Sequence, residues 1–149
     1  MKSTPKHNYM KYWKVIRRFI LRKYDITTAE LDMMFFLHDE VYFTKEKFQE
    51  FNKIFRWDKN KFNNLRMNGW IDAVTTFNLS RGRKKYRLSL KGSRMINYVY
   101  TKLDGEILTT DRTKNPLFKT KVKYSDKAYK NMIIEMNNFI KQQQHHSPE

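Results

Sequence analysis

The sequence predicts a mainly α-helical protein with one small antiparallel β-hairpin, an α+β fold. Apolar side chains recur every three to four residues near both chain ends, over residues 8–24 and 125–143, which is the period of an amphipathic helix. Between them, residues 44–92 contain two short helical patterns followed by two β-prone runs around a glycine. A length of 149 residues and a hydrophobic content of 40% suit one domain, residues 1–149, with an ordinary core.

Two helices are expected in the first forty residues. The first spans residues 8–24, and one apolar face of it is formed by Tyr9, Tyr12, Trp13, Ile16, Phe19 and Ile20. The second begins after Thr27, because Thr27 with Glu30 three residues later has the pattern of a capping box. Its inward-facing side chains are expected to be Leu31, Met34, Phe35 and Leu37.

The middle of the chain predicts two more helices behind a short β-prone run. Val41, Tyr42 and Phe43 are expected to form an edge strand of the later hairpin. Thr44 and Asp58 are good N-cap residues for a third and a fourth helix. The third would carry Phe48, Phe51 and Ile54, and the fourth Phe62, Leu65 and Met67. The few residues between these helices suit the tight connection of a helix-turn-helix.

A glycine is expected to end the fourth helix, and the hairpin follows it. Gly69 takes the C′ position, where a left-handed conformation is common. Residues 70–77 and 85–88 supply two strands, and Gly82 between them permits a tight turn. Ser89 is expected to cap a fifth helix, and the chain ends in a helix over 125–143 with a continuous apolar stripe.

The charge of the chain is positive and unevenly distributed. There are 31 Lys and Arg against 15 Asp and Glu, a formal net charge of +16, so a polyanion is the first partner to consider. Residues 57–94 alone hold ten Lys and Arg against two Asp. A helix followed by a basic hairpin is the shape of a winged-helix DNA reader, in which the helix enters the major groove and the hairpin lies at the backbone or the minor groove.

A basic linker spans residues 109–124, between the fifth and the last helix. It is longer than connections in compact domains usually are. It could be a second DNA-contacting arm or a solvated connector. We expect the solvated connector, because the segment carries no ladder of aromatic residues.

Several classes of function are disfavoured by what the sequence lacks. No cysteine occurs, which excludes disulfides and thiolate metal sites. The longest apolar run, residues 33–37, is too short to cross a bilayer, and the amino terminus has no apolar segment typical of a signal peptide. We therefore expect a cytoplasmic protein of a bacterial or phage-infected cell, with no membrane partner.

The sequence also carries no constellation typical of catalysis. His38, Asp39 and Glu40 form the only close cluster of acids and histidine. Neither a zinc-binding H-E-x-x-H pattern nor a phosphate-binding glycine loop is present. We therefore predict no enzymatic activity, no metal and no cofactor.

Three stretches of the chain resemble MarR-type regulators. Residues 25–31 (Asp-Ile-Thr-Thr-Ala-Glu-Leu) resemble the start of the second helix of that family, and residues 65–71 (Leu-Arg-Met-Asn-Gly-Trp-Ile) resemble its step from recognition helix to wing. Residues 88–92 (Leu-Ser-Leu-Lys-Gly) resemble the sequence that follows the wing, although Ser80 stands near the place where the family's wing has an aspartate. The resemblance implies a winged helix-turn-helix over residues 44–92, flanked by dimerisation helices over 8–24 and 125–143.

The DNA-contacting residues are expected on the fourth helix and the hairpin. Asn can form two hydrogen bonds with adenine, and Arg or Lys can bind guanine or phosphate. The recognition-helix candidates are Lys59, Asn60, Lys61, Asn63, Asn64 and Arg66. The wing candidates are Arg81, Arg83, Lys84 and Lys85. The alternative is that both sets form solvated polar surface.

The resemblance also implies a homodimer, in which the first and last helices of two subunits intertwine. Both chain ends independently offer apolar helical faces that need a partner. The interface candidates are Tyr12, Trp13, Ile16, Tyr129, Met132, Ile133, Met136, Phe139 and Ile140. The alternative is that these faces pack on each other within one subunit.

We therefore predict a sequence-specific transcription regulator that binds double-stranded DNA as a homodimer. The alternative is a winged-helix protein that organises DNA or belongs to a larger assembly, for example a phage particle, without selecting a sequence. The 21 Lys against 10 Arg, with 12 Asn, suggest the AT-rich genome of a low-GC bacterium or its phage. The operator and a small-molecule effector stay open; the resemblance would place an effector pocket near Trp13, Met34 and Tyr42.

Overall fold

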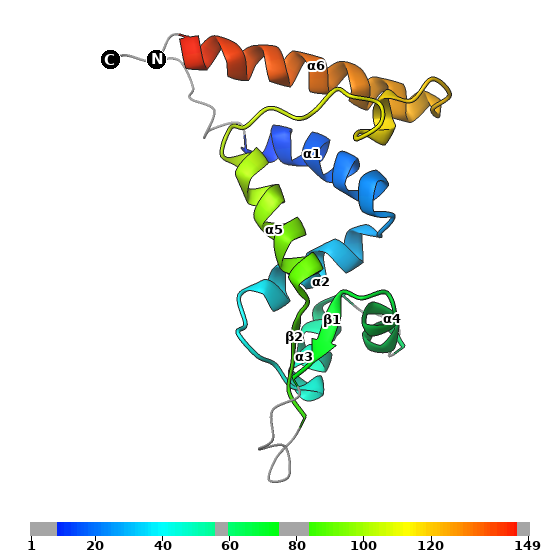
Figure 1. Ribbon diagram of the computed structural model, residues 1–149, viewed down its shortest axis with the longest axis vertical. Coiled ribbons are helices and arrows are strands. Elements are labelled where there is room, and N and C mark those ends of the chain that lie inside the picture. Colours follow the sequence, from blue (N-terminus) through cyan, green and yellow to red (C-terminus); the bar gives the residue numbers. More distant parts are fainter. Residues whose placement is uncertain (1–8, 56–59, 75–83, 146–149) are drawn as a thin grey trace. The chain divides into compact units, whose positions relative to one another are not determined.

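The structure is a computed structural model, and it describes residues 9–55, 60–74 and 84–145 (Figure 1). These ranges contain six α-helices and one two-stranded antiparallel sheet, which confirms a mainly helical α+β fold. The helices are α1 (Tyr9–Tyr24), α2 (Thr28–His38), α3 (Lys45–Phe55), α4 (Lys61–Met67), α5 (Leu90–Leu103) and α6 (Tyr124–His145), with the 3-10 turn η3 (Pro116–Phe118) and the strands β1 (Ile71–Ala73) and β2 (Tyr86–Leu88).

The chain divides into two compact units. Residues 1–26 and 98–149 form one of them, which we call the terminal unit. Residues 27–97 form the other, which we call the central unit. The helix-turn-helix and hairpin expected from the sequence thus fall in the central unit, and the first and last helices fall in the terminal unit.

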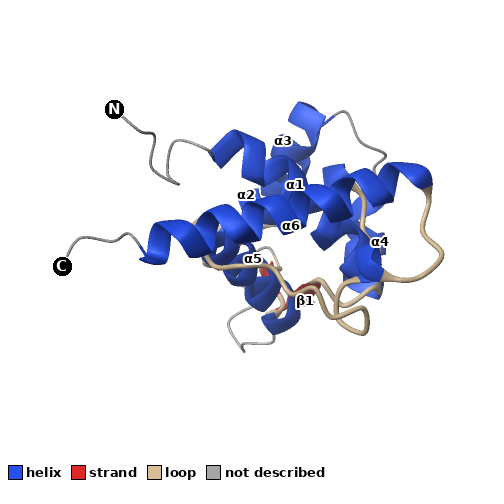
Figure 2. Cartoon of the chain, turned by 90° about the horizontal axis from the view of Figure 1, so that it is seen from above, coloured by secondary structure: helices blue, strands red, loops and turns tan. Residues whose placement is uncertain are grey.

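The terminal unit is built around the contact between α1 and α6, with η3 against both (Figures 1 and 2). The rings of Tyr12 on α1 and Phe139 on α6 lie 6.1 Å apart between centroids. The core of this unit includes side chains from one face of each helix, Tyr12, Val15, Ile16, Phe19, Ile20, Ile133, Met136 and Ile140. The predicted three-to-four spacing therefore marks most of the buried faces of both helices, but Tyr9 was wrongly included, because it lies at the first residue of α1 and is 42% exposed.

The segment between α5 and α6 is anchored to the terminal unit by buried amides. Asn137 on α6 accepts a hydrogen bond from Leu108 N at 3.0 Å and donates one to Leu108 O at 2.8 Å. Asn115 is fully buried, donates to Thr109 O at 2.8 Å and accepts from Leu117 N at 3.0 Å. Leu117 is itself fully buried. The expectation of a solvated connector over residues 109–124 is therefore correct only in part: most of its side chains are exposed, but Asn115 and Leu117 are buried, and η3 contacts both α1 and α6.

A turn stabilised by Asp111 leads into this anchor. The amide N and the hydroxyl of Thr113 donate to Asp111 Oδ1 at 2.9 and 2.8 Å. These two hydrogen bonds, the backbone one first, lower the pKa of the Asp111 carboxyl. Asn115 N in turn donates to Asp111 O at 2.7 Å, so the turn ends at the buried asparagine.

The central unit begins with helices whose caps agree with the predictions. Glu30 N donates to Thr27 Oγ1 at 3.1 Å and Thr27 N donates to Glu30 Oε1 at 2.8 Å, which is the predicted capping box of α2. Lys47 N donates to Thr44 Oγ1 at 3.1 Å at the start of α3. These local signals fix where both helices start.

The sheet of the central unit pairs β1 with β2 and adds one bridge from before α3. Ile71 lies opposite Leu88, and Ala73 lies opposite Tyr86. Phe43 pairs with Tyr86 in an antiparallel bridge, with N···O distances of 2.9 and 2.8 Å. The predicted edge position of Phe43 is confirmed, although the pairing is a single bridge rather than a strand.

Several details differ from the sequence-based expectations. Met67 was expected on the inner side of the fourth helix, but its side chain is 84% exposed, because it lies two residues, or about 200°, around the helix from the buried Leu65. Ile54 of α3 is likewise exposed. β1 comprises residues 71–73; of the expected strand 70–77, residues 75–77 lie outside the described ranges. Asp58, the expected N-cap, also lies outside them, and α4 begins after Asn60.

Candidate nucleic-acid interface

α4 is held in the central unit by two buried side chains. Leu65 is fully buried, and the Phe62 ring makes edge-to-face contacts with Phe48 at 5.0 Å and with Tyr86 at 4.9 Å between centroids. A helix of seven residues is too short to be stable alone, so its position depends on such tertiary contacts. Phe62 therefore connects α4 to both α3 and β2.

The end of α4 is fixed by its glycine and by a lysine from α5. Gly69 has φ +82°, Gly69 N donates to Arg66 O at 3.1 Å, and Trp70 N donates to Leu65 O at 2.9 Å. This is the Schellman arrangement, and it confirms the predicted C′ glycine. Lys91 donates from Nζ to Asn68 O at 3.0 Å and lies 4.0 Å from the centre of the Trp70 ring. The turn into β1 is thus closed by a cation at the negative end of the helix.

The outer face of α4 is polar. Asn63, Asn64 and Arg66 are exposed, Asn60 before the helix is exposed, and Lys61 is half-buried. The Arg66 guanidinium carbon lies 5.1 Å from the centre of the Tyr86 ring, which holds this arginine toward the sheet. These five residues are the described part of the predicted recognition-helix set, and Lys59 lies outside the described residues.

A shallow groove runs between the outer face of α4 and β1. It is lined by Asn63, Arg66, Met67, Ile71, Asp72 and Ala73. Met67 and Asp72 were missed by the sequence analysis. Met67 was expected on the core-facing side of the helix. Asp72 lies in a strand, where the alternation of side chains predicts one exposed residue between two that face the core. That alternation is the signal that could have identified Asp72.

The described part of the hairpin is basic and exposed. Lys84, Lys85 and Arg87 are exposed, while Tyr86 between them is buried. Val74 N donates to Lys85 O at 2.8 Å, so pairing continues one residue beyond β1. Arg81, Arg83 and the turn at Gly82 lie outside the described ranges. Of the wing candidates, Lys84 and Lys85 are therefore the two that the structure places beside the sheet.

Charge is segregated within the central unit. Its described residues from 60 onward carry seven Lys and Arg against Asp72 alone, whereas residues 27–55 carry three Lys against six Asp and Glu. The acids belong mainly to α2, α3 and the segment between them. α4, the strands and the start of α5 therefore form the electropositive part of this unit.

The predicted dimer residues lie at the contact between α1 and α6 within one chain. Five of them, Tyr12, Ile16, Ile133, Met136 and Ile140, are already buried there. The remaining four, Trp13, Tyr129, Met132 and Phe139, are half-buried. Within one chain, the two helical faces thus pack on each other, as in the alternative given above. The half-buried residues of the set are the ones that a second subunit could still cover.

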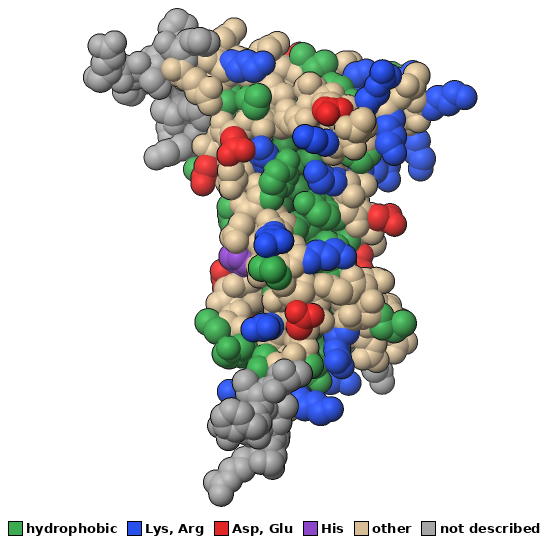
Figure 3. Space-filling view, viewed as in Figure 1, with side chains coloured by type: hydrophobic (Ala, Val, Ile, Leu, Met, Phe, Trp, Pro, Cys, Tyr) green, Lys and Arg blue, Asp and Glu red, His purple; other side chains and the backbone are tan. Residues whose placement is uncertain are grey.

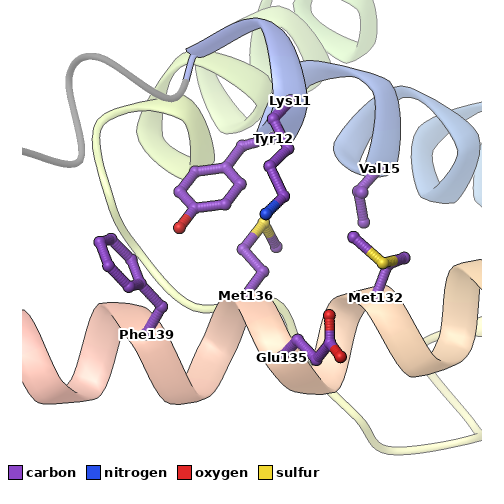
Figure 4. Close-up of a pocket in the computed structure, with 7 residues that line it drawn as sticks. All are labelled: Lys11, Tyr12, Val15, Met132, Glu135, Met136 and Phe139. Atoms are coloured by element: carbon purple, nitrogen blue, oxygen red, sulfur yellow. The ribbon is translucent and has the colours of Figure 1, made fainter. Parts of the chain in front are cut away.

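A small cavity lies between α1 and α6 (Figure 4). It is lined by apolar side chains together with the charged Lys11 and Glu135, and the lining comprises Lys11, Tyr12, Val15, Met132, Glu135, Met136 and Phe139. Its volume of about 110 Å³ is smaller than the cavity of about 150 Å³ that binds benzene in an engineered protein core. The residues suggested above for an effector pocket, Trp13, Met34 and Tyr42, do not line it, and Met34 is fully buried in the core.

Comparisons with known proteins give no relative for this chain: no family model, curated protein or solved structure matches it. Within the described residues, no group of three or more His, Asp or Glu side chains is arranged to hold a metal ion. In the same ranges, the helices are too short or too polar to cross a membrane. The observations that bear on function are therefore the surface of α4 and the distribution of charge.

Proposed function

We propose that this chain is a winged-helix protein that binds double-stranded DNA and regulates transcription as a homodimer. The observation that carries the proposal is the outer face of α4, where Asn63, Asn64 and Arg66 are exposed while Phe62 and Leu65 anchor the helix. The order of elements supports it: a helix, a bridge at Phe43, two helices and two antiparallel strands follow one another as in a winged helix-turn-helix.

In this proposal, α4 enters the major groove and reads base edges. The Asn63 and Asn64 amides have the donor and acceptor that adenine requires, and Arg66 can bind guanine or a phosphate. Met67, which is exposed at the end of the same helix, offers an apolar contact to a thymine methyl group. The exposed Lys84, together with the predicted wing residues Arg81 and Arg83, which lie outside the described ranges, would bind the backbone or the minor groove beside it.

The homodimer is proposed from the half-buried residues of the terminal unit. Trp13, Tyr129, Met132 and Phe139 keep part of their surface exposed beside the contact of α1 with α6. A two-fold symmetric pair of subunits would cover this surface and present two copies of α4 to a palindromic duplex. Such a duplex would have its half-sites about one helical turn, or a multiple of it, apart.

Selection of bound sequences from a random duplex pool tests the proposal. We expect one enriched palindromic motif for the natural chain and relaxed preference at one or two base positions for Asn63→Ala and Asn64→Ala, each worth about 1–3 kcal/mol of discrimination. Asn138→Ala is the matched control, because Asn138 is an exposed asparagine of α6 in the terminal unit. A pool without any enriched motif would contradict sequence-specific reading.

A second candidate function is favoured by the charge of the terminal unit. Its described residues carry fifteen Lys and Arg against six Asp and Glu, a net charge of +9, compared with +3 for the central unit. Such charge supports DNA binding without sequence preference, as in a DNA-organising protein of a larger assembly. Competition of a labelled preferred duplex by bulk DNA separates the two functions, since a specificity ratio near one favours the organising role.

A further inference from the structure

A second concentration of positive charge in the described chain lies far from α4 in the sequence. Residues 112–130, which we call the lysine segment, run from the turn before η3 into the first turns of α6. They contain seven Lys and Arg and one acid, Asp126. Six of these cations are exposed, namely Arg112, Lys114, Lys119, Lys121, Lys123 and Lys127. Figure 3 shows Lys and Arg side chains gathered at its upper right, over the start of α6 and the loop before it.

The acid within the lysine segment is already neutralised by α1. Asp126 is buried, and its Oδ1 accepts from Arg18 Nε at 2.8 Å while its Oδ2 accepts from Arg22 Nε at 3.2 Å. Arg18 also donates from Nη2 to Ser125 Oγ at 3.2 Å. Because two arginines share this one carboxylate, the cluster itself keeps a net positive charge. It also binds the first turn of α6 to α1.

The exposed lysines have no comparable partners. Lys119, Lys121, Lys123 and Lys127 form no ion pair with any residue that the structure describes. The segment that carries them is nevertheless fixed, because Asn115, Leu117 and Asp126 are buried on either side of the first three lysines. A charged surface whose backbone is already ordered loses less conformational entropy on binding than a flexible basic tail.

The type of side chain indicates what these cations would contact. Lysine is a compact point charge that binds phosphate without the planar geometry by which arginine recognises guanine. Single-stranded nucleic acid is bound by series of aromatic platforms. The lysine segment has one strongly exposed aromatic side chain, Tyr124, at 87%. The surface therefore fits a phosphate backbone read for its charge rather than its bases.

We propose that the lysine segment is a second DNA-binding surface, which contacts the phosphate backbone of duplex DNA independently of sequence. The proposal rests on the proposed function in one respect, namely that duplex DNA is the partner of this chain. It adds a division of labour: α4 supplies base discrimination, and the lysine segment supplies affinity that depends on salt. Each phosphate neutralised by a lysine contributes about 0.9 to the slope of log K against log salt.

The experiment measures the affinity of the full chain for a random-sequence duplex over a series of salt concentrations. The test variant replaces four exposed lysines of the segment by glutamine: Lys119, Lys121, Lys123 and Lys127. The control variant makes the same change of net charge at four exposed lysines elsewhere: Lys11, Lys14, Lys53 and Lys141. The test variant should flatten the salt slope by about 3 to 4, and the control by about 1 or less.

The same variants separate this proposal from the proposed function. The ratio of preferred to random duplex affinity should be unchanged in the test variant, because both duplexes lose the same phosphate contacts. Equal salt slopes for the test and control variants would overturn the second surface while leaving reading by α4 intact. A natural chain that binds no duplex would overturn both. A test variant that loses only binding to single-stranded RNA or to vesicles of anionic lipid would assign the surface to that other partner and overturn the DNA contact.

Discussion

Replacing Phe62 by leucine should destabilise the central unit through the loss of two ring contacts. The Phe62 ring lies 5.0 Å from the Phe48 ring and 4.9 Å from the Tyr86 ring, with interplanar angles of 76° and 87°. Edge-to-face pairs are worth about 0.5–1.5 kcal/mol each beyond the area that they bury. Leucine keeps most of the apolar contact area, so we expect Phe62→Leu to lower the free energy of unfolding of this unit by about 1–3 kcal/mol.

Tryptophan fluorescence during denaturant unfolding measures this change in the central unit. A Trp13→Phe background is required, because Trp13 belongs to the terminal unit, whereas Trp57 and Trp70 belong to the central unit. Asn63→Ala is the matched control, since Asn63 is the exposed neighbour of Phe62 and should change the unfolding free energy by less than about 0.5 kcal/mol. The slope of free energy against denaturant should stay the same in both variants if only stability changes.

The two results together test how α4 is held. Phe62→Leu should also reduce the preference of the chain for the selected duplex over duplexes with altered bases, because a seven-residue helix that loses two of its anchoring contacts is positioned less firmly. An unfolding free energy equal to that of Asn63→Ala would refute the reasoning that the rings hold α4 in place. If the unfolding free energy falls by the predicted amount but base preference is unchanged, the link between the anchoring of α4 and DNA recognition is refuted.

Three further changes test other parts of the structure. Asn137→Ala leaves the buried N–H and C=O of Leu108 unpaired and should lower the unfolding free energy by about 2–5 kcal/mol in denaturant titrations. The control Asn138→Ala, at an exposed position, should lower it by less than about 0.5 kcal/mol. Equal losses in the two variants would contradict the role of Asn137 in anchoring Leu108. Gly69→Ala puts a side chain at φ +82° and should cost about 1–2 kcal/mol, seen as a lower thermal midpoint, and an unchanged midpoint would mean that this turn tolerates a Cβ without strain. Burial, and then the charge of Glu106, raises the pKa of the Tyr98 phenol, and burial, and then the charge of Tyr98, raises the pKa of the Tyr24 phenol. Both phenols therefore ionise at a lower pH in the unfolded chain, so the folding stability present below pH 10 falls as the pH rises further. A Tyr98→Phe variant whose unfolding free energy falls with pH as steeply as that of the natural chain would contradict this.

Features encoded by neighbouring residues could be predicted from the sequence. The capping box of Thr27 and Glu30, the glycine after α4 and the cap of α5 each depend on residues within four positions of one another. Gly92 N donates to Ser89 Oγ at 3.1 Å, as the predicted cap requires. Periodicity likewise identified the buried faces of α1 and α6, because a helix repeats every 3.6 residues regardless of its partner.

Features that depend on contacts between distant residues could not be predicted. The pairing of Leu108 with Asn137 joins residues 29 apart, and that of Arg18 with Asp126 joins residues 108 apart. Neither pair has a local pattern, so the segment between α5 and α6 has the composition of a solvated connector although it is anchored. The buried asparagines are the reason, since amides that bond to backbone groups are compatible with the interior.

The candidate site could be predicted in part. The exposed asparagines of α4 follow from the spacing of Phe62 and Leu65, whereas the exposed Met67 contradicts the apolar pattern by which it was placed inside. The ten Lys and Arg of residues 57–94 predicted that the DNA-binding surface lies in this part of the chain. Among the described residues, the division of the chain into units assigns a larger net charge to the terminal unit, because that unit joins two segments distant in the sequence.

The central claim is that the outer face of α4 contacts duplex DNA, and titration of the isotope-labelled chain with the selected duplex tests it most directly by nuclear magnetic resonance. We expect the amide signals of Asn63, Asn64 and Arg66 to shift on binding, together with that of Lys84, while those of α2, which carries Glu30 and Asp32 and no Lys or Arg, stay in place. Saturating duplex that shifts none of the α4 signals would contradict the claim.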